Sequence, residues 1–444
     1  MQELVEIENL LDNLYPICRS ITGEGLRESL NILSMHLPLE ILGFKTGEKA
    51  LNWEIPQEWI IRDAWIKDKN EVKVLDFKDN NLHVINYSAP INKEITLEEL
   101  LQHIYTNPSL PNAIPYVISY YKKRWGFCME YAKFKELEEG KYHAFIDSEF
   151  IDGELNLGHT MLKGESEKEI LISSYLCHPS MANNELSGPI VLAFLYKRIF
   201  KWKKRNFTYR FVVNPETIGS IAYLSRFGEQ LIKHMYSGII LTCLGGDMSL
   251  SYKKSRRGDT PIDKITAHLF DSKVICGTMR EFTPINGSDE RQYCSPGFNL
   301  PVGQFAKLIY GQYKEYHTSL DNKELMGIEN VLKSIDEIEL ILKANEYNGY
   351  YINQYPYGEI KLDKYDLYPD MNGPSTNGYS NSNKMDGRQE LNYILMILNY
   401  SDGEHTLLDI AQKCNCNILN LVDIVDKLIA KGVLEGPYFE KGVR

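Results

Sequence analysis

The sequence lacks the long apolar runs and the excess of positive charge that mark several common protein classes. None of its apolar stretches reaches about 18 residues, the length that a helix needs to cross a membrane. Lysine and arginine together number 49, whereas aspartate and glutamate number 60, so the net charge is -11. Because phosphate binding requires a cationic face, this balance argues against a dominant role at anionic membranes or on nucleic acids.

Cysteine is scarce as well, and its eight positions show no spacing typical of a disulfide framework. The closest pair, Cys414 and Cys416, is separated by a single residue, which is too close for the usual CxxC arrangement of a zinc site. We therefore predict reduced thiols and a cytoplasmic location. The first 20 residues are acidic with helical periodicity, so we do not expect them to act as a signal peptide.

The length of 444 residues exceeds that of one ordinary domain and predicts several. Residues 151–350 alternate strand-like and helix-like segments, which predicts a mostly parallel, helix-covered sheet that residues 1–50 are expected to join. Residues 51–150 contain short β-like runs and turn signals, so they are expected to form an inserted β-rich domain. Residues 351–387 are rich in Pro, Gly, Asn, Ser and Tyr and predict a linker, and residues 388–444 predict a winged helix.

Polar residues follow three of the predicted strands directly. His178 ends one strand in the stretch CHPSMANNELSG, Glu216 follows a second in NPETIGS, and Asp247 follows a third in CLGGDMS. Ligands of such sheets bind at the carboxyl ends of the strands, so these side chains are expected at one edge. Imidazole and carboxylate are the usual non-sulfur ligands of zinc, and a further carboxylate can take a proton from metal-bound water.

Two later loops contain candidates of the same kind. The stretch NGSDERQY contains Asp289 and Glu290, which either support the site or pair with Arg291. The stretch EYHTSLDN contains His317, and Asp321 is expected to orient that histidine or to cap the following helix. The five clusters together predict a metal or catalytic site assembled from separate loops.

Together, CHPSMANNELSG, PETIGS, GGDMS, GSDERQY and YHTSLD resemble the aminopeptidase-like DUF4910 proteins, distant relatives of the M28-type zinc aminopeptidases. The stretches YPICRSITGEGLRESL and WEIPQEWIIRDAWI resemble the same family with its inserted β domain, DUF2172. The resemblance implies an α/β fold, a zinc-peptidase-like (phosphorylase/hydrolase-like) α/β/α sandwich with an inserted β-rich domain and a C-terminal winged helix. Such proteins are also associated with polysaccharide-biosynthesis loci.

The resemblance also implies roles for individual residues. His178, Asp247 and His317 match metal ligands of the active peptidases. Glu216 matches the carboxylate that acts as the general base. A zinc-dependent hydrolase of aminopeptidase type is the activity that this pattern implies.

The chain departs from the pattern of the active peptidases at three positions. Ser180 and Asn184 stand where the peptidases have a supporting aspartate and the aspartate that bridges two zinc ions, and Thr217 replaces a ligand carboxylate. An amide cannot neutralise the charge between two cations, so we expect at most one zinc ion. Glu185 could supply a displaced carboxylate, and a site without metal is a further alternative.

The sequence therefore predicts a metal-dependent hydrolase that cleaves an amide bond in a small peptide or an amino-modified sugar. Two alternatives stay open, a degenerate non-catalytic protein that binds a ligand or partner, and a DNA-binding regulator that senses a small molecule. The three departures favour the first alternative over the second. The predicted recognition helix, ILNLVDIVDKLIAKG, is nearly neutral, so binding to nucleic acid is not expected. Membrane binding is not expected either, and a homo-oligomer stays open.

Overall fold

The computed structural model describes residues 1–369 and 387–442 of the chain. The chain forms two compact units, and each is described by itself below. The first unit comprises Met1–Thr260 and Gly277–Glu337, and the second comprises Pro261–Cys276 and Ile338–Arg444.

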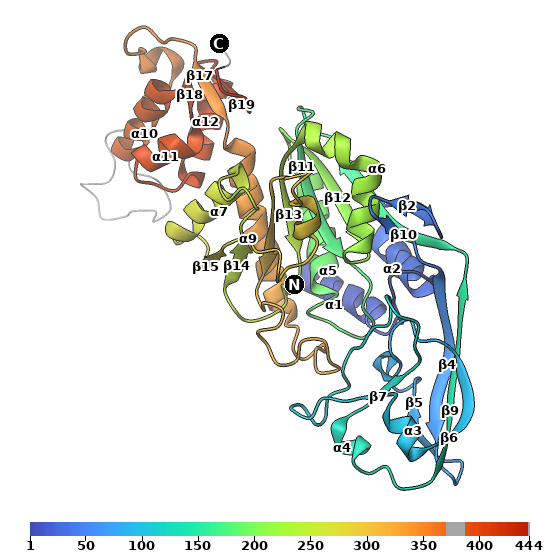
Figure 1. The fold of residues 1–444 in the computed structure, drawn as a ribbon. Coiled ribbons are helices and arrows are strands. Elements are labelled where there is room, and N and C mark those ends of the chain that lie inside the picture. Colours follow the sequence, from blue (N-terminus) through green and yellow to red (C-terminus); the bar gives the residue numbers. More distant parts are fainter. Residues whose placement is uncertain (370–386, 443–444) are drawn as a thin grey trace, which may run out of the picture. The chain divides into compact units, whose positions relative to one another are not determined.

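A mixed eight-stranded sheet is the centre of the first unit (Figure 1). Its four middle strands, β12, β11, β13 and β16, are parallel to one another, whereas antiparallel pairs flank them on both sides. Every residue of β11 and β12 is buried, as expected for strands covered on both faces. In sheet order, the strands are β1 (Glu40–Lys45), β10 (Glu154–Leu162), β12 (Thr208–Asn214), β11 (Glu169–Tyr175), β13 (Met235–Leu241), β16 (Val302–Ala306), β14 (Leu250–Lys253) and β15 (Gly277–Arg280).

Helices cover both faces of this sheet. Val212 of β12 belongs to a hydrophobic cluster with residues of α6 (Ile218–His234). The next residue towards the N-terminus, Phe211, instead packs against Tyr196 of α5 (Ser187–Phe200), with ring centroids 5.3 Å apart. Successive residues of a strand point to opposite faces, so α5 and α6 lie on opposite sides. The other helices of the first unit are α1 (Gln2–Leu14), α2 (Glu24–Ser34) and α8 (Glu290–Tyr293), and α9 (Ile328–Tyr347) continues into the second unit.

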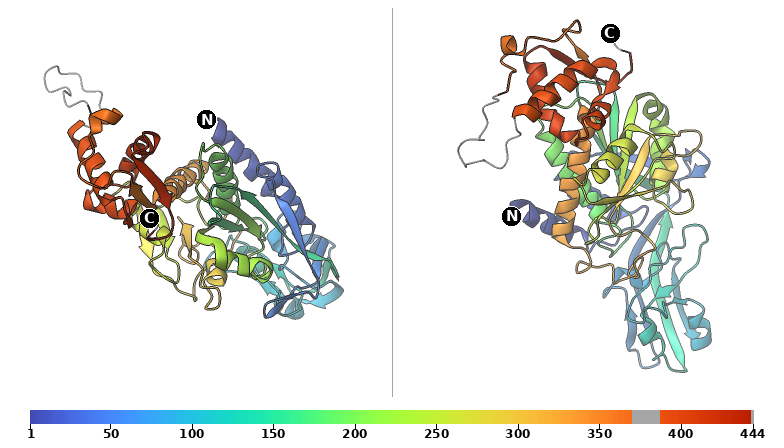
Figure 2. Two further views of the ribbon diagram at one scale, coloured as in Figure 1. Left: turned by 90° about the horizontal axis from the view of Figure 1, so that it is seen from above. Right: turned by 90° about the vertical axis from the view of Figure 1, so that its left-hand side faces the viewer.

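The region predicted as an inserted β-rich domain contains a separate antiparallel four-stranded sheet with a hydrophobic cluster of its own. Figure 1 and the right-hand view of Figure 2 show this sheet beyond one end of the central sheet. A short hairpin, β2 (Lys49–Ala50) and β3 (Trp53–Glu54), precedes it. The sheet contains β5 (Lys73–Asp76), β4 (Glu58–Lys67), β9 (Lys141–Ile151) and β6 (Ile91–Thr96), and the module also contains η1 (Asn81–His83), α3 (Leu97–Leu101), β7 (Ile104–Tyr105), β8 (Phe127–Cys128) and α4 (Tyr131–Phe134).

The second unit contains the winged helix, and it begins earlier than the sequence predicts. Strand β17 (Tyr350–Asn353) lies between β18 (Asp402–Thr406) and β19 (Leu434–Tyr438), so the predicted linker 351–387 starts inside a paired strand. A four-residue strand is too short to show a reliable alternation, which explains the difference. Residues 370–386 of that linker lie outside the described residues. The helices are α7 (Pro261–Asp271), η2 (Leu362–Tyr365), α10 (Gly387–Tyr400), α11 (Leu407–Lys413) and α12 (Leu419–Ala430).

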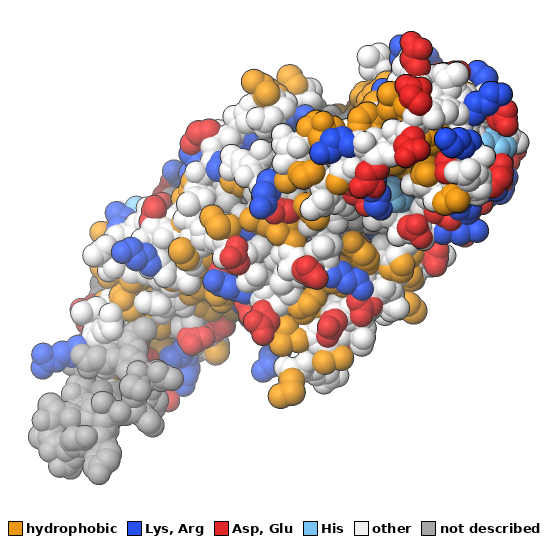
Figure 3. All heavy atoms as spheres, turned by 90° about the horizontal axis from the view of Figure 1, so that it is seen from below, with side chains coloured by type: hydrophobic (Ala, Val, Ile, Leu, Met, Phe, Trp, Pro, Cys, Tyr) orange, Lys and Arg blue, Asp and Glu red, His pale blue; other side chains and the backbone are white. Residues whose placement is uncertain are grey.

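Neither residues 1–369 nor residues 387–442 contain a helix whose length and apolarity would let it span a bilayer. On the face shown in Figure 3, acidic and basic side chains are interspersed among hydrophobic ones. The described side chains of that face form no continuous cationic patch. This distribution agrees with the acidic composition of the chain.

Candidate functional site

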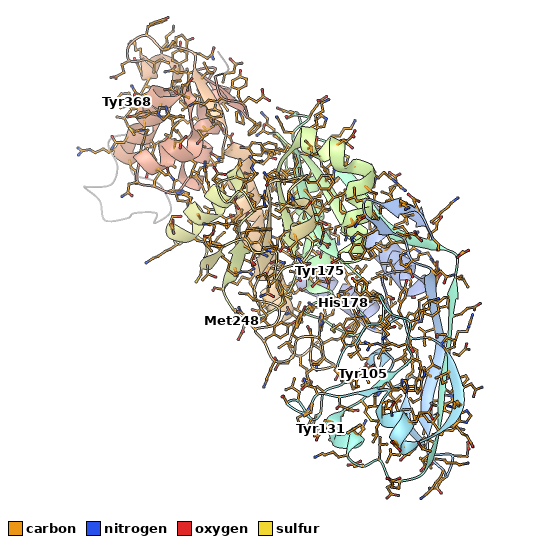
Figure 4. All side chains as sticks on the ribbon, viewed as in Figure 1. Tyr105, Tyr131, Tyr175, His178, Met248 and Tyr368 are labelled. Carbon is orange, nitrogen blue, oxygen red and sulfur yellow. The ribbon has the colours of Figure 1, made fainter. Side chains whose placement is uncertain are left out.

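The candidate site lies at the carboxyl ends of the parallel strands, where such sheets bind ligands. His178 follows β11, Glu216 follows β12, and His317 belongs to a loop that comes after β16. These three side chains line one cavity of about 330 Å³ within the first unit. Figure 4 shows His178 and Tyr175 close together at this edge of the sheet. The structure thus brings two of the three predicted metal ligands and the predicted base into one wall.

His178 is buried and held on both sides of its ring. Its Nδ1 lies 2.6 Å from Oε2 of Glu185, and its Nε2 lies 3.8 Å from Oε2 of Glu216. Burial by itself would lower the pKa of His178, but Cys177 and Glu185 outweigh it and raise that pKa well above its ordinary value. Burial raises the pKa of the Cys177 thiol to about 11, so at neutral pH the carboxylate of Glu185 is the charge that matters. Glu185 therefore fixes the ring and directs Nε2 into the cavity.

Arg19 is a second support of this loop, and it is fully buried. Its Nε donates a hydrogen bond to the backbone carbonyl of His178 at 3.1 Å and lies 3.9 Å from the carboxylate of Glu185. Its Nη1 donates to the carbonyl of Leu14. The guanidinium thus balances the buried charge of Glu185, which in turn accepts a hydrogen bond from the backbone N–H of Cys177. The sequence alone does not reveal this pairing, because 166 positions separate Arg19 from Glu185.

Glu216 is oriented by a single hydroxyl and is otherwise open to the cavity. Ser288 donates from its Oγ to Oε1 of Glu216 at 2.8 Å. Burial raises the pKa of Glu216, although the charge of His178 and the Ser288 hydrogen bond oppose the shift. A carboxylate with a raised pKa is suited to exchanging protons near neutral pH.

Asp289 holds the Glu216 loop through Thr217, and neither Asp289 nor Glu290 lines the cavity. Asp289 accepts hydrogen bonds from the backbone N–H of Thr217 at 2.7 Å and from the side chains of Asn214 and Ser220. Burial and the charge of Glu216 raise the pKa of Asp289 to about 7. Glu290 forms a buried ion pair of 2.8 Å with Lys253, rather than with the neighbouring arginine.

His317 has an unsatisfied nitrogen. Its Nε2 is buried and has no hydrogen-bond partner among the described residues. Burial and the charge of His178 lower the pKa of His317 to about 3, so its imidazole is neutral and keeps a lone pair. The two imidazole centroids are 5.3 Å apart, and the ring of Tyr116 packs edge-on against both. Tyr116 also donates its backbone N–H to the carbonyl of His317 at 2.8 Å.

Asp321 holds the loop that contains Asn183 and Asn184, whereas the sequence predicts that Asp321 orients His317 or caps a helix. Its carboxylate accepts hydrogen bonds from the backbone N–H groups of Asn183 and Asn184, at 2.6 and 3.0 Å, and from the hydroxyl of Tyr313. The side chain of Asn184 donates to the hydroxyl of Tyr175 at 3.0 Å. Its Oδ1 is buried and has no partner among the described residues. The second of the two asparagines therefore presents an unpaired oxygen.

The structure does not bring Asp247 to the cavity. Its side chain is exposed, and it is not among the lining residues. Figure 4 shows its neighbour Met248 apart from His178. Strand β13 already ends at Leu241, so the chain has left the sheet edge six residues before Asp247. Sequence spacing alone could not reveal where that strand ends. Ser180 is buried but does not line the cavity either.

Four residues of the site loops have backbone conformations with positive φ, which are uncommon for side chains other than glycine. They are Ser180 (φ 48), Thr217 (φ 64), Cys243 (φ 52) and His317 (φ 55). Such conformations persist only where the surrounding structure holds them, and they often occur at functional sites. The hydrogen bonds of Asp289 to Thr217 and of Tyr116 to His317 are two such restraints.

Comparison with known proteins places the chain in a family. A model of the domain of unknown function DUF4910 matches residues 8–348, and a winged helix-turn-helix model matches residues 349–436. The chain belongs to the DUF4910 family. A Clostridium acetobutylicum relative is 40% identical over 426 residues, covering 95% of this chain and 94% of its own. That relative is named as a polysaccharide biosynthesis protein with an aminopeptidase-like domain.

Solved structures show the same fold for this DUF4910 chain. A crystal structure from Clostridium acetobutylicum, named as a peptidase, is 39% identical, with a TM-score of 0.88 and coverage of 98% of this chain and 96% of that one. A zinc aminopeptidase from Bacillus subtilis matches at 12% identity with a TM-score of 0.57, covering 77% and 93%. An M28 peptidase precursor from Shewanella amazonensis matches at 12% identity with a TM-score of 0.55, covering 78% and 92%. The central sheet is therefore of the M28 zinc aminopeptidase type.

The side chains of this DUF4910 site include imidazole and carboxylate groups, which are ligand types of zinc. His178 and His317 both line the cavity, and the Nε2 of His317 is buried and unpaired, whereas the protonated His178 would release its proton on binding a metal. Asn184 offers a neutral oxygen, and Thr217 offers no charge, so a second ion would lack anionic ligands. Ligand atoms of Cys177, His178 and Glu185 also lie within 4.8 Å of one another. That trio is already satisfied by its own hydrogen bonds and supports His178 instead.

Proposed function

We propose that this DUF4910 protein is a metal-dependent hydrolase of aminopeptidase type that cleaves an amide bond in a small peptide or an amino-modified sugar. One observation carries the proposal: His178, His317 and Glu216 meet in one cavity wall, with the Nε2 of His317 buried and unpaired. The sheet shared with zinc aminopeptidases supports it. The name of the Clostridium relative supports a link to polysaccharide biosynthesis.

Each side chain has a defined task in this proposal. A zinc ion held by His178 and His317 would polarise the amide carbonyl and acidify a water molecule. Glu216 takes the proton of the attacking water and delivers it to the leaving amine, for which its raised pKa suits it. Ser288 keeps the carboxylate of Glu216 in place, and Glu185 keeps His178 in the orientation that presents Nε2. Asp247, as an exposed residue, has no part in this set.

A second candidate function is non-catalytic ligand binding. The neutral side chains of Asn184 and Thr217 favour it, because they remove charge that two-metal peptidases use. A DNA-binding regulator is less well supported. Lys427 of α12 pairs with Glu390 at 3.0 Å, and Lys431, which directly follows α12, pairs with Asp366 at 3.4 Å, so both cations are compensated within the second unit.

The test uses the purified full chain with added zinc. Hydrolysis is followed with aminoacyl p-nitroanilides and with N-acetylated amino sugars, beside Glu216→Gln and the control Glu8→Gln on the exposed side of α1. Glu216→Gln should lower kcat by about 100-fold or more and leave the zinc content unchanged, because only proton transfer is lost. Glu8→Gln should match the wild type. Turnover that survives Glu216→Gln would overturn its role, and zinc-free, inactive protein would favour ligand binding.

A further inference from the structure

Two cysteines lie together at the turn between α11 and α12 of the winged helix. Cys414 is the C-cap residue of α11, and Cys416 follows it two positions later. Helix α10 contacts both α11 and α12 (Figure 1). Neither cysteine lines the cavity described above, so their chemistry is separate from that of the proposed hydrolase.

The backbone of this turn holds both cysteines in defined positions. Asn415, which lies between them, has φ 50, and its N–H donates to the carbonyl of Gln412 at 3.0 Å. The N–H of Cys416 donates to the carbonyl of Ala411, also at 3.0 Å. These two hydrogen bonds around a left-handed residue form a Schellman motif, which ends a helix in one geometry. A step of two residues spans about 7 Å at most, so the two thiol side chains start close together.

The two thiols interact with each other and with one tyrosine. Burial raises the pKa of both thiols, and hydrogen bonding between the two sulfur atoms contributes to each shift. The hydroxyl of Tyr393, on α10, donates to the sulfur of Cys416 and accepts a hydrogen bond from Nε2 of Gln389 at 3.0 Å. Both cysteines are partly exposed, so a small ion can reach them.

The pair offers two soft sulfur ligands without the further ligands that harder metal ions require. Within residues 1–369 and 387–442, no histidine, aspartate or glutamate joins the two thiols in a group whose ligand atoms lie within 4.8 Å of one another. His268 approaches the same turn, but its Nε2 accepts the N–H of Ile418 at 3.1 Å. A structural zinc ion needs four ligands, so two thiols suit it poorly. Soft thiolates select Cu(I), an ion that is stable with only two ligands.

We propose that Cys414 and Cys416 form a binding site for one Cu(I) ion, held between their two sulfur atoms. Each thiol releases its proton to solvent when its sulfur binds, and copper enters and stays as Cu(I), so no electron is transferred. The hydrogen bond from Tyr393 fixes the sulfur of Cys416. The site does not depend on the proposed hydrolase activity.

The test titrates the reduced full chain with Cu(I) under nitrogen, against the competing chelator bicinchoninate. The wild type should take up one more equivalent of Cu(I) than Cys414→Ser or Cys416→Ser, because a hydroxyl is a hard ligand. Each serine variant should weaken the binding of that equivalent by about 100-fold or more, whereas Tyr393→Phe should weaken it by about tenfold, as is typical of a residue that supports a ligand. The control Cys276→Ser removes an exposed cysteine of the same unit and should bind as the wild type does.

Zinc analysis and mass spectrometry of the same samples separate the alternatives. The zinc content should be equal in the wild type and both serine variants, and zinc lost from those variants would assign the pair to zinc and overturn the proposal. A wild-type chain that binds no more Cu(I) than the folded double variant Cys414→Ser with Cys416→Ser would overturn it too. A pair that leaves Cu(I) to the chelator and instead forms a disulfide in air, detected as the loss of two hydrogen atoms, would show a redox role and contradict the copper site.

Discussion

The polar side chains at the sheet edge and those at helix α12 differ in burial and in pairing. At the sheet edge, the polar groups are buried, and a few atoms remain unpaired, including Nε2 of His317 and Oδ1 of Asn184. Lys427 of α12 and Lys431, which directly follows it, are more exposed, and each pairs with a carboxylate of its own unit. Leaving a buried polar atom unpaired costs free energy, so such atoms indicate a site that awaits a partner. Exposed, paired charges indicate a solvated surface.

Removing Arg19, which holds the loops at the sheet edge, should change the free energy of unfolding more than any other substitution considered below. Arg19→Ala leaves the buried carboxylate of Glu185 without its guanidinium partner, and should lower the free energy of unfolding by about 3–5 kcal/mol. Urea denaturation of the full chain measures this difference. The double variant Arg19→Met with Glu185→Gln should recover most of it, because neither charge remains. An Arg19→Ala protein as stable as wild type would show that the pair is not a support.

Carboxylates introduced at positions 184 and 217 test whether the missing charges explain the difference in metal count from the two-metal peptidases. Asn184→Asp together with Thr217→Glu should raise zinc from one towards two ions per chain, because each added anion offsets the repulsion between cations. Either change alone should not suffice. Elemental analysis measures the zinc content per chain. A folded double variant with no additional zinc would mean that these two positions do not face the metal.

The buried carboxyl of Asp289 predicts a pH dependence of stability. Its folded pKa of about 7 lies above the value in the unfolded chain, so its protonated form is favoured by folding. The contribution is fully present below the unfolded pKa and is lost as the pH rises through about 7. The free energy of unfolding should therefore fall by roughly 2–4 kcal/mol between pH 4 and pH 8, part of it through this residue. Asp289→Asn should flatten that slope, and an unchanged slope would assign it to other groups.

The sequence predicts much of the fold, and it predicts that His178 and Glu216 follow neighbouring strands. The apolar runs of β11 and β12 and the histidine and carboxylates that follow them identify the sheet and its edge. The sequence does not reveal that Asp247 lies outside the cavity, because the end of β13 depends on pairing with β16, which the local sequence does not encode. The pairing of Arg19 with Glu185 and the packing of Tyr116 on both histidines are contacts between distant segments, which only the folded chain reveals.

A charge reversal at the end of helix α12 should have the smallest effect of these substitutions. Because its cations are already paired, the full chain should bind duplex DNA no more tightly than a generic acidic protein at physiological salt. Lys431→Glu should then change nothing in a fluorescence anisotropy titration. Submicromolar, sequence-dependent DNA binding that Lys431→Glu abolishes would show that the cations at α12 form a binding surface and are not merely solvated.

Zinc stoichiometry tests the central proposal most directly. Purified full chain, equilibrated with zinc and then dialysed, should retain one ion per chain by elemental analysis. His178→Ala and His317→Ala should each lose most of it, whereas Asp247→Ala should retain it, since that exposed side chain lies outside the cavity. Two ions per chain, or one ion that survives both histidine variants and leaves with Asp247→Ala, would contradict the account.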